Sequence, residues 1–157
     1  MPTLAINKKA NFDYQISSKY QAGLVLFGHE VKSIKNKNIS LKGSYITIQN
    51  TKKKNKQITE LFLIKAHITP YKQAGIIPDY DPERPRKLLL KKNEIKHLIG
   101  KKSEQGLTLV PLKIYTKRDL IKLEFGIGRG KKKHDKRESI KKRDVERKIQ
   151  RAKLSKY

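Results

Sequence analysis

The sequence predicts a mainly β protein, a six-stranded antiparallel barrel that is closed or partly open, with two or three short helices beside it. Three observations predict this fold class. Val, Ile, Leu and Tyr gather in short segments of residues 1–128, with turn-like stretches between them. The segment Ser44–Gln49 alternates strictly, because Tyr45 and Thr47 fall on one face while Ile46 and Ile48 fall on the other. A barrel also leaves few exposed strand edges.

Six segments have the composition of strands. They are Phe12–Ile16, Gly23–Ile34, Ser44–Gln49, Ile58–His67, Leu107–Thr116 and Ile121–Gly128. Between the third and fourth, Lys52–Lys56 reads as a charged hairpin loop.

Helical spacing is present in Lys92–Lys101, where Ile95, Leu98 and Ile99 fall on one face. Gly100 is a suitable C-cap for this helix. A second short helix is expected over Ser17–Gln21.

Residues 129–157 are expected to form a basic tail that follows the barrel of residues 1–128. From Gly128 onward the chain has 14 Lys/Arg and 4 Asp/Glu and few apolar side chains, so the isolated tail should be disordered. Acids precede bases by four residues, as in Glu138 and Lys142, which favours a helix once a polyanion is bound. The glycine-rich run Gly126–Gly130 is interpreted as a hinge between barrel and tail.

The net charge of +25 indicates a nucleic-acid partner. No basic segment is paired with the apolar aromatic face of an interfacial helix, so membrane binding is not expected. The chain lacks Cys, a signal-peptide run and any stretch of 18 apolar residues. We therefore expect a soluble protein that stays in the compartment where it is made, and we expect it to be monomeric when free.

No enzymatic chemistry is indicated by the sequence. The four histidines His29, His67, His97 and His134 are scattered and match no metal-ligand spacing. The glycines near Lys131 do not form a phosphate-binding loop, because a second Lys follows at the wrong spacing. We expect no catalytic residue, no metal and no cofactor.

The segment Pro78–Leu90 contains three prolines that hold it extended. Arg84, Arg86 and Lys87 follow, just before three leucines. Guanidinium groups fork onto phosphate and stack on bases, so these cations are candidates for RNA contact. An ordinary loop with solvated charges remains the alternative.

Seven ordered segments resemble the SsrA-binding protein family, the tmRNA-binding partners of bacterial trans-translation. The resemblance spans about Ile6 to Arg147. The segments are NKKANFDYQI (residues 7–16), AGLVLFGHEVKSIK (22–35), SYITI (44–48), HITPY (67–71), DPERPRKLLL (81–90), TLVPLKIY (108–115) and GRGKKKHDKRE (128–138).

The resemblance implies an oligonucleotide-binding (OB) barrel that binds the tRNA-like domain of tmRNA at its elbow. It also implies that the tail is disordered in isolation and becomes helical on the ribosome, where it enters the decoding site and the vacant mRNA channel. The implied function is delivery of tmRNA to stalled ribosomes for rescue and tagging of nascent chains, without catalysis.

Site residues carry over by motif. The resemblance implies tmRNA contacts at Asn7, Lys8, Gln21, Arg84, Arg86, Lys87, Leu89, Lys122, Arg129, Lys131 and Lys132. In the tail it implies decoding-site roles for His134, Asp135, Lys136 and Arg137. Their shared chemistry is phosphate neutralisation and stacking, with RNA shape read more than base identity.

Three departures from the family pattern stand out. Gln21 replaces the common Glu, so a neutral amide must supply that contact. Lys91 follows the three leucines where His or Asn is usual. Residues 117–119 replace a small glycine turn, which we expect to alter only a hairpin tip.

Glu30 and Lys32 are expected to form a strand-end ion pair rather than an RNA contact.

Two alternatives remain open at this point. A structural ribosomal or generic RNA-coating protein would bind any structured RNA with similar affinity, whereas a tmRNA-specific protein keeps its preference as salt rises. An RNA-processing enzyme would need a metal or acid–base cluster, which the sequence does not indicate.

Overall fold

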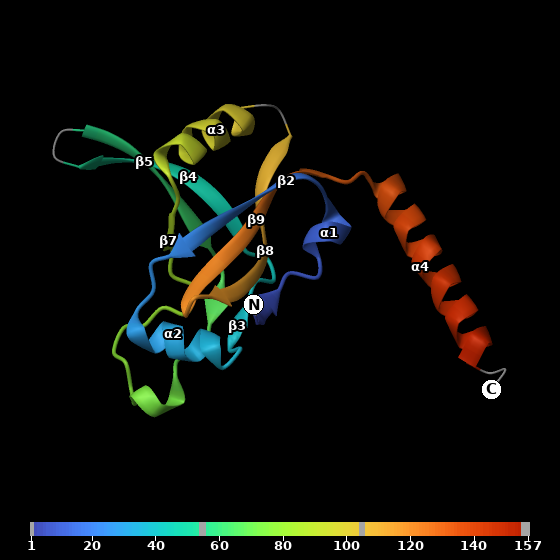
Figure 1. Cartoon of the computed structure of the whole chain (residues 1–157), viewed down its shortest axis with the longest axis horizontal. Helices are drawn as coiled ribbons and strands as arrows, with labels where there is room; N and C mark the ends of the chain where they lie inside the picture. The colour runs from blue at the N-terminus through green and yellow to red at the C-terminus, as the bar shows by residue number, and fades with distance from the viewer. Residues whose placement is uncertain (1, 54–55, 104–105, 155–157) are drawn as a thin grey trace.

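The computed structural model describes residues 2–53, 56–103 and 106–154. A ring of six antiparallel strands forms the body of the protein in the order β8, β4, β5, β7, β2, β9, and β9 pairs again with β8 to close it (Figure 1). The strands are β2 (Tyr14–Leu24), β4 (Tyr45–Lys53), β5 (Lys56–Ile64), β7 (Arg86–Leu89), β8 (Leu107–Lys117) and β9 (Leu120–Gly130). The predicted six-stranded barrel is confirmed.

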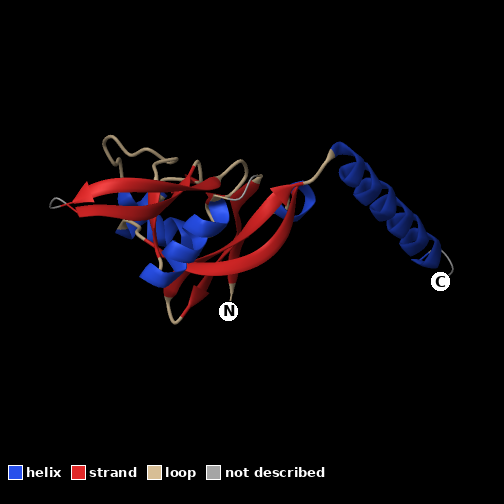
Figure 2. Ribbon diagram, turned by 90° about the horizontal axis from the view of Figure 1, so that it is seen from above, coloured by secondary structure: helices blue, strands red, loops and turns tan. Residues whose placement is uncertain are grey.

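Three short strands lie outside the ring. β1 (Thr3–Ile6) pairs with β8, and β3 (Ile39–Ser40) pairs with β6 (His67–Ile68) in a separate small sheet. The helices are α1 (Ala10–Asp13), α2 (Gly28–Lys35), α3 (Lys92–Lys102) and α4 (Lys133–Leu154), with a 3-10 turn at Lys72–Ala74. In Figure 2 the helix α4 extends away from the barrel.

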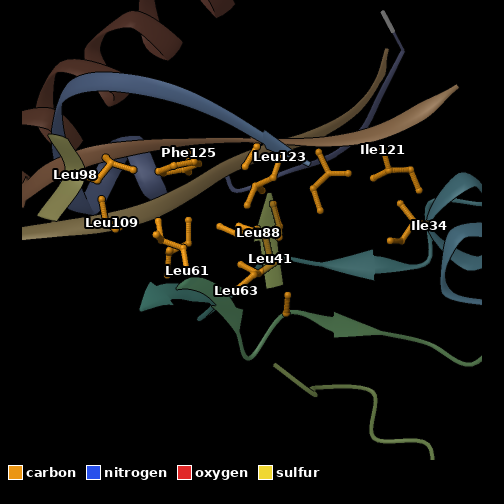
Figure 3. Close-up of a cluster of buried hydrophobic side chains, with 14 of the residues drawn as sticks. Ile34, Leu41, Leu61, Leu63, Leu88, Leu98, Leu109, Ile121, Leu123 and Phe125 are labelled. Carbon is orange, nitrogen blue, oxygen red and sulfur yellow. The ribbon is translucent and has the colours of Figure 1, made fainter. Parts of the chain in front are cut away.

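The core fills the interior of the ring. Leu123 and Phe125 of β9 face Leu61 and Leu63 of β5 with almost no exposure (Figure 3). Leu98 of α3 lies at one end of this cluster and Ile34 of α2 at the other. The two helices therefore cover opposite ends of the barrel, and burial of these aliphatic groups is the main stabilising contribution.

A second small cluster explains why the middle of β8 is buried on both faces. Val110 and Leu112 pack outside the ring against Ala10 of α1, with Tyr14 and Ile16 beside them. The register of β8 shifts between Pro111 and Lys113, which moves side chains between the two faces.

Two expected elements are wrong. Ser17–Gln21 is not a helix but the middle of β2, paired along its length with β9. Gly23–Ile34 is not one strand, because β2 ends at Leu24 and α2 begins at Gly28. The backbone N–H of Phe27 donates to Glu30 Oε2 at 2.9 Å, which stabilises the start of that helix.

The predicted helix near Lys92 is confirmed, but its end is not at Gly100. The helix continues to Lys102, and the Ser103 hydroxyl donates to the Gly100 carbonyl at 2.6 Å. In the predicted hairpin loop Lys52–Lys56, the paired strands reach Lys53 and resume at Lys56, and residues 54 and 55 lie outside the described residues.

The glycine-rich run Gly126–Gly130 is strand rather than a hinge. A Cβ at Gly126 would come within 2.6 Å of the Ile16 side chain, and one at Gly128 within 2.8 Å of it. A Cβ at Gly128 would also lie 3.0 Å from the backbone oxygen of Gln15. These glycines therefore permit β2 to cross closely over β9.

Candidate nucleic-acid interface

An open groove of about 750 Å³ lies where β2, β7 and β9 meet at one end of the barrel. Three predicted site residues, Gln21, Leu89 and Lys122, line it together. Sheet pairing places them there, because Gly23 of β2 pairs with Leu89 on one side and with Lys122 on the other. Residues far apart in sequence are thus neighbours in space.

Gly23 shapes the floor of the groove. A Cβ at this position would lie 3.3 Å from the Leu89 Cβ, so a larger residue would press on Leu89. Leu89 is 53% exposed and Leu120, which also lines the groove, is 61% exposed. Two apolar side chains thus stand open to solvent among charged neighbours, an arrangement suited to a base or ribose face.

The groove walls are predominantly cationic. Lys91, Lys117, Arg118 and Lys122 line it together with a single acid, Glu94. That carboxylate accepts the backbone N–H of Lys91 at 2.9 Å, at the start of α3. The positive potential of the four cations therefore dominates the groove.

Sequence reasoning missed Lys91, Lys117 and Arg118 as groove residues. Arg118 and Asp119 form the tight β8–β9 turn with φ of 49° and 60°, the left-handed region. Residues 117–119 form a hairpin tip as expected, and the turn also places Lys117 and Arg118 on the groove wall. Their departure from the family pattern was the available signal.

Arg86 is not on the surface, which corrects its expected RNA contact. Its side chain is fully buried and pairs with Glu30 at 2.8 Å, and Glu30 is fully buried as well. Arg86 Nη1 donates to the Ala66 carbonyl at 2.6 Å and Nη2 donates to the Pro82 carbonyl at 2.9 Å. The guanidinium is satisfied inside the protein.

Arg84 shares the same carboxylate. Its Nη2 contacts Glu30 Oε2 at 2.5 Å, and its guanidinium lies 4.1 Å from the Phe27 ring centre. The Glu30 ion pair was expected with Lys32 at a strand end, but it forms from a helix with two arginines instead.

Two opposing effects act on Glu30. Burial raises the pKa of its carboxyl, but hydrogen bonds from Arg84 and Phe27 and the charge of Arg86 outweigh burial and hold that pKa below its usual value. Glu30 is therefore the charged partner of both arginines at neutral pH.

Lys87 points away from Arg86 and is about one-third exposed. Its Nζ lies 2.5 Å from Glu60 Oε1 on the neighbouring strand β5. Of these three cations predicted to contact RNA, Arg84 and Lys87 thus lie near the surface with acidic partners, and Arg86 is internal.

Asn7 and Lys8 lie at the opposite end of β2 from the groove. Asn7 Nδ2 donates to the Pro111 carbonyl at 3.0 Å, which fixes the turn between β1 and α1. Lys8 is exposed beside it. Along β9, Arg129 lies seven positions after Lys122, which corresponds to roughly 23 Å of strand at about 3.3 Å per residue.

The first turn of the tail is tied to α1. Lys131 donates from its backbone N–H to the Asp13 carbonyl and from Nζ to the Asn11 carbonyl, both at 2.8 Å. Lys136 Nζ pairs with Asp13 Oδ1 at 2.9 Å. These contacts place the start of α4 beside the N-terminal turn.

Within the tail motif, Asp135 has a local structural role. Its Oδ2 accepts the backbone N–H of Lys132 at 3.3 Å, at the start of α4. His134 is 80% exposed and faces Glu138 one turn on, at 4.0 Å. Arg129, Lys132 and Arg137 are exposed.

Within residues 2–53, 56–103 and 106–154, no group of three His, Cys, Asp or Glu side chains is arranged to hold a metal ion. Over the same residues, no helix has the length and apolar character needed to cross a membrane.

Comparison with known proteins shows which family this chain matches. Residues 4–155 match the family model described as SmpB protein. An SsrA-binding protein of Alkaliphilus metalliredigens is 48% identical over 148 residues, covering 94% of this chain and 88% of the relative. That of Geobacillus kaustophilus is 49% identical over 149 residues, covering 95% of this chain and 90% of the relative.

A solved structure described as "tmRNA-SmpB: a journey to the center of the bacterial ribosome" also matches. It has a TM-score of 0.64 and 39% sequence identity, and covers 87% of this chain and 93% of the solved one. The barrel, the order of its motifs and these matches agree, and the chain belongs to the SmpB family of SsrA-binding proteins.

Proposed function

We propose that this chain binds the tRNA-like domain of tmRNA and delivers it to stalled ribosomes for trans-translation. The groove that joins Gln21, Leu89 and Lys122 is the observation that carries the proposal. The relatives are named as SsrA-binding proteins, and the matching solved structure pairs SmpB with tmRNA and the ribosome.

The groove suits a folded RNA elbow in three ways. Lys122, Lys117 and Arg118 neutralise phosphates as the backbone bends past them. Leu89 and Leu120 offer apolar surface to unstacked bases. Gln21 supplies an amide that both donates and accepts hydrogen bonds, in place of a carboxylate that RNA phosphates would repel.

We assign residues 1–128 to tmRNA binding and residues 129–157 to the ribosome. His134 stacks on an rRNA base in the decoding site, Lys136 and Arg137 pair with phosphates there, and Asp135 stabilises the start of the helix that presents them. The rest of the tail follows the vacant mRNA channel, with its last residues, 155–157, outside the described part. Asn7 and Lys8, between β1 and α1, and Arg129, Lys131 and Lys132, just before α4, supply further RNA contacts in this proposal.

The proposed role is binding and delivery, without a catalytic group, a metal or a cofactor. The compartment is the cytoplasm, or an organelle with ribosomes of bacterial type.

Deletion of every residue after Gly130 tests the division of labour. The deletion ends the chain where β9 ends, so the paired strands of the barrel remain. We expect tmRNA binding to stay largely intact, reduced only by the loss of Lys131 and Lys132, and no tagging of nascent chains on stalled ribosomes. A fall of both activities to the same extent would show that the tail is part of the tmRNA site.

A further inference from the structure

The β4–β5 hairpin extends well beyond the barrel. β8 pairs with β4 only at Ile46, and β7 pairs with β5 over Leu61–Leu63. From Asn50 paired with Thr59 outward, β4 and β5 pair only with each other among the described residues. In both Figure 1 and Figure 2 this hairpin projects away from the barrel on the side opposite α4. We call the described residues of this part, 50–53 and 56–59, the arm.

The arm carries a concentrated positive charge. No acid occurs between Lys42 and Glu60, whereas residues 52, 53, 54 and 56 are lysines. Among the described residues, the side chains of Lys52 and Lys56 are exposed and no ion pair is formed by either. Lys52 and Lys56 are therefore available to a partner.

The outer part of the arm has no third strand beside it among the described residues. A two-stranded hairpin of this kind has little stability of its own. An anion bound by the exposed Lys52 and Lys56 would neutralise their charge, so the arm is better suited to a polyanion than to bare solvent.

The arm begins at the same end of the barrel as the groove. Leu61 pairs with Leu88, so the next pair along the two strands places Glu60 beside Leu89, which lines the groove. The ion pair between Lys87 and Glu60 fastens β7 to the strand at the base of the arm. An RNA seated in the groove therefore passes close to this base.

We propose that the arm binds the phosphate backbone of the same folded RNA that the groove holds. This inference rests on the proposed function. The four paired positions from Asn50 and Thr59 outward reach roughly 13 Å beyond the barrel at about 3.3 Å per residue. The arm has no aromatic residue and no Arg, so it has no side chain for stacking or for bidentate base recognition. It adds affinity that depends on salt and is indifferent to sequence.

The test compares three double variants of the full chain in titrations of tmRNA at several salt concentrations. The arm variant is Lys52→Gln with Lys56→Gln. The control with equal charge loss is Lys35→Gln with Lys72→Gln, two exposed positions away from the groove and the arm. The charge-conserving variant is Lys52→Arg with Lys56→Arg.

For the arm variant we expect the slope of log affinity against log salt to flatten by about one to two, because each lysine releases up to about one counterion. Affinity at physiological salt should fall about tenfold, as expected for lost charged contacts. The control and the charge-conserving variant should keep the parent slope. Circular dichroism of each variant shows that the barrel remains folded.

If the arm variant keeps the parent slope, the arm does not touch this RNA and the inference is overturned. The inference also fails if only ribosome binding weakens, since the arm then serves a different RNA. A parent protein that shows no preference for tmRNA would instead overturn the proposed function, so the two failures are distinguishable.

Discussion

Arg86 and Glu30 form an ion pair at 2.8 Å with both side chains fully buried, although 56 positions separate them in the sequence. The pair joins the first residue of β7 to α2, and Tyr80 Oη lies within 3.4 Å of Arg86 Nη2. The segment that precedes β7 has turns at residues 78–79 and 82–83 rather than the expected extended course, and it is thereby fixed against the barrel. The charges of Arg86 and Glu30 therefore stabilise the fold, and the cations that line the groove lie elsewhere.

Replacement of Arg86 by Met should lower the free energy of unfolding by about 3 kcal/mol or more, because Glu30 keeps its charge and loses a buried partner. Lys87→Met is the matched control. Its partner pair with Glu60 is partly exposed, so that loss should be about 1 kcal/mol or less. Urea unfolding measures both, and equal midpoints for Arg86→Met and the parent would contradict the buried role.

The Glu30 carboxyl also predicts a pH dependence. Its pKa is lower in the folded chain than the ordinary value of 4.5, so the unfolded chain binds more protons as the pH falls through this range. The stability from Glu30 is present above pH 4.5 and is lost as the pH falls through the folded pKa.

Glu30→Gln should therefore be less stable than the parent at neutral pH, and the difference should shrink in acid. Urea midpoints from neutral pH down to about pH 3 measure this convergence across the ordinary carboxyl range. Glu83→Gln, at an exposed position, should differ little from the parent throughout. A gap for Glu30→Gln that is the same at every pH would show that the carboxylate charge does not matter.

The close crossing of β2 over β9 predicts unequal effects of three similar substitutions. Gly126→Ala and Gly128→Ala place a Cβ within 3.0 Å of the Ile16 side chain, so each should destabilise by about 1–3 kcal/mol. Gly130→Ala meets no atom within 4 Å and should be nearly neutral.

Ile16→Val added to Gly128→Ala should recover part of the loss, because it removes Ile16 Cδ1, the atom nearest the added Cβ there. At Gly126 the nearest atom is Ile16 Cγ2, which valine keeps, and the Ser18 backbone oxygen lies 3.1 Å away, so recovery should be smaller. Thermal unfolding of the single and double variants compares them. Equal stability of all three alanine variants would exclude a steric role for these glycines.

Strand composition and period predicted the six-stranded ring because segments such as Ser44–Gln49 bury one face, with Ile46 inside and Tyr45 outside. The local sequence pattern did not show where β2 ends and α2 begins. The apolar run from Gly23 reads as one strand, and the cap that starts the helix depends on Glu30 bonding back to Phe27. The glycines near Gly128 read as a hinge because the strand that crosses them is over a hundred residues away in sequence.

The candidate site was also only partly predictable from the sequence. Motif resemblance nominated Gln21, Leu89 and Lys122, and the structure gathers them in one groove. Arg86 was misassigned because sequence does not show burial, and its carboxylate partner lies in a distant segment. Lys117 and Arg118 were not predicted as groove residues, because only the β8–β9 pairing brings their turn to the groove.

Lys122→Ala should flatten the salt dependence of tmRNA binding by about one unit or less, because one phosphate contact is lost. Lys35→Ala, on α2 and outside the groove, is the control and should leave the slope unchanged. Filter binding at four or more salt concentrations gives both slopes. A slope for Lys122→Ala equal to that of the parent would remove this residue from the interface.

A peptide of residues 129–157 should be largely disordered in water, since the tail has few apolar side chains to bury. In the whole chain the contacts of Lys131 and Lys136 with α1 support the first turns of α4. Circular dichroism of the peptide, of the whole chain and of Asp13→Asn measures the tail helix. A peptide as helical as the tail in the whole chain would show that α1 contributes nothing.

The most direct test is binding of the purified protein to tmRNA, to an ordinary tRNA and to an unrelated structured RNA of similar size, from low to physiological salt. A shape-specific groove predicts that tmRNA binding stays tight as salt rises while the other two weaken. If all three affinities fall together, the groove acts only as a general cationic surface, and the proposed role in ribosome rescue is contradicted.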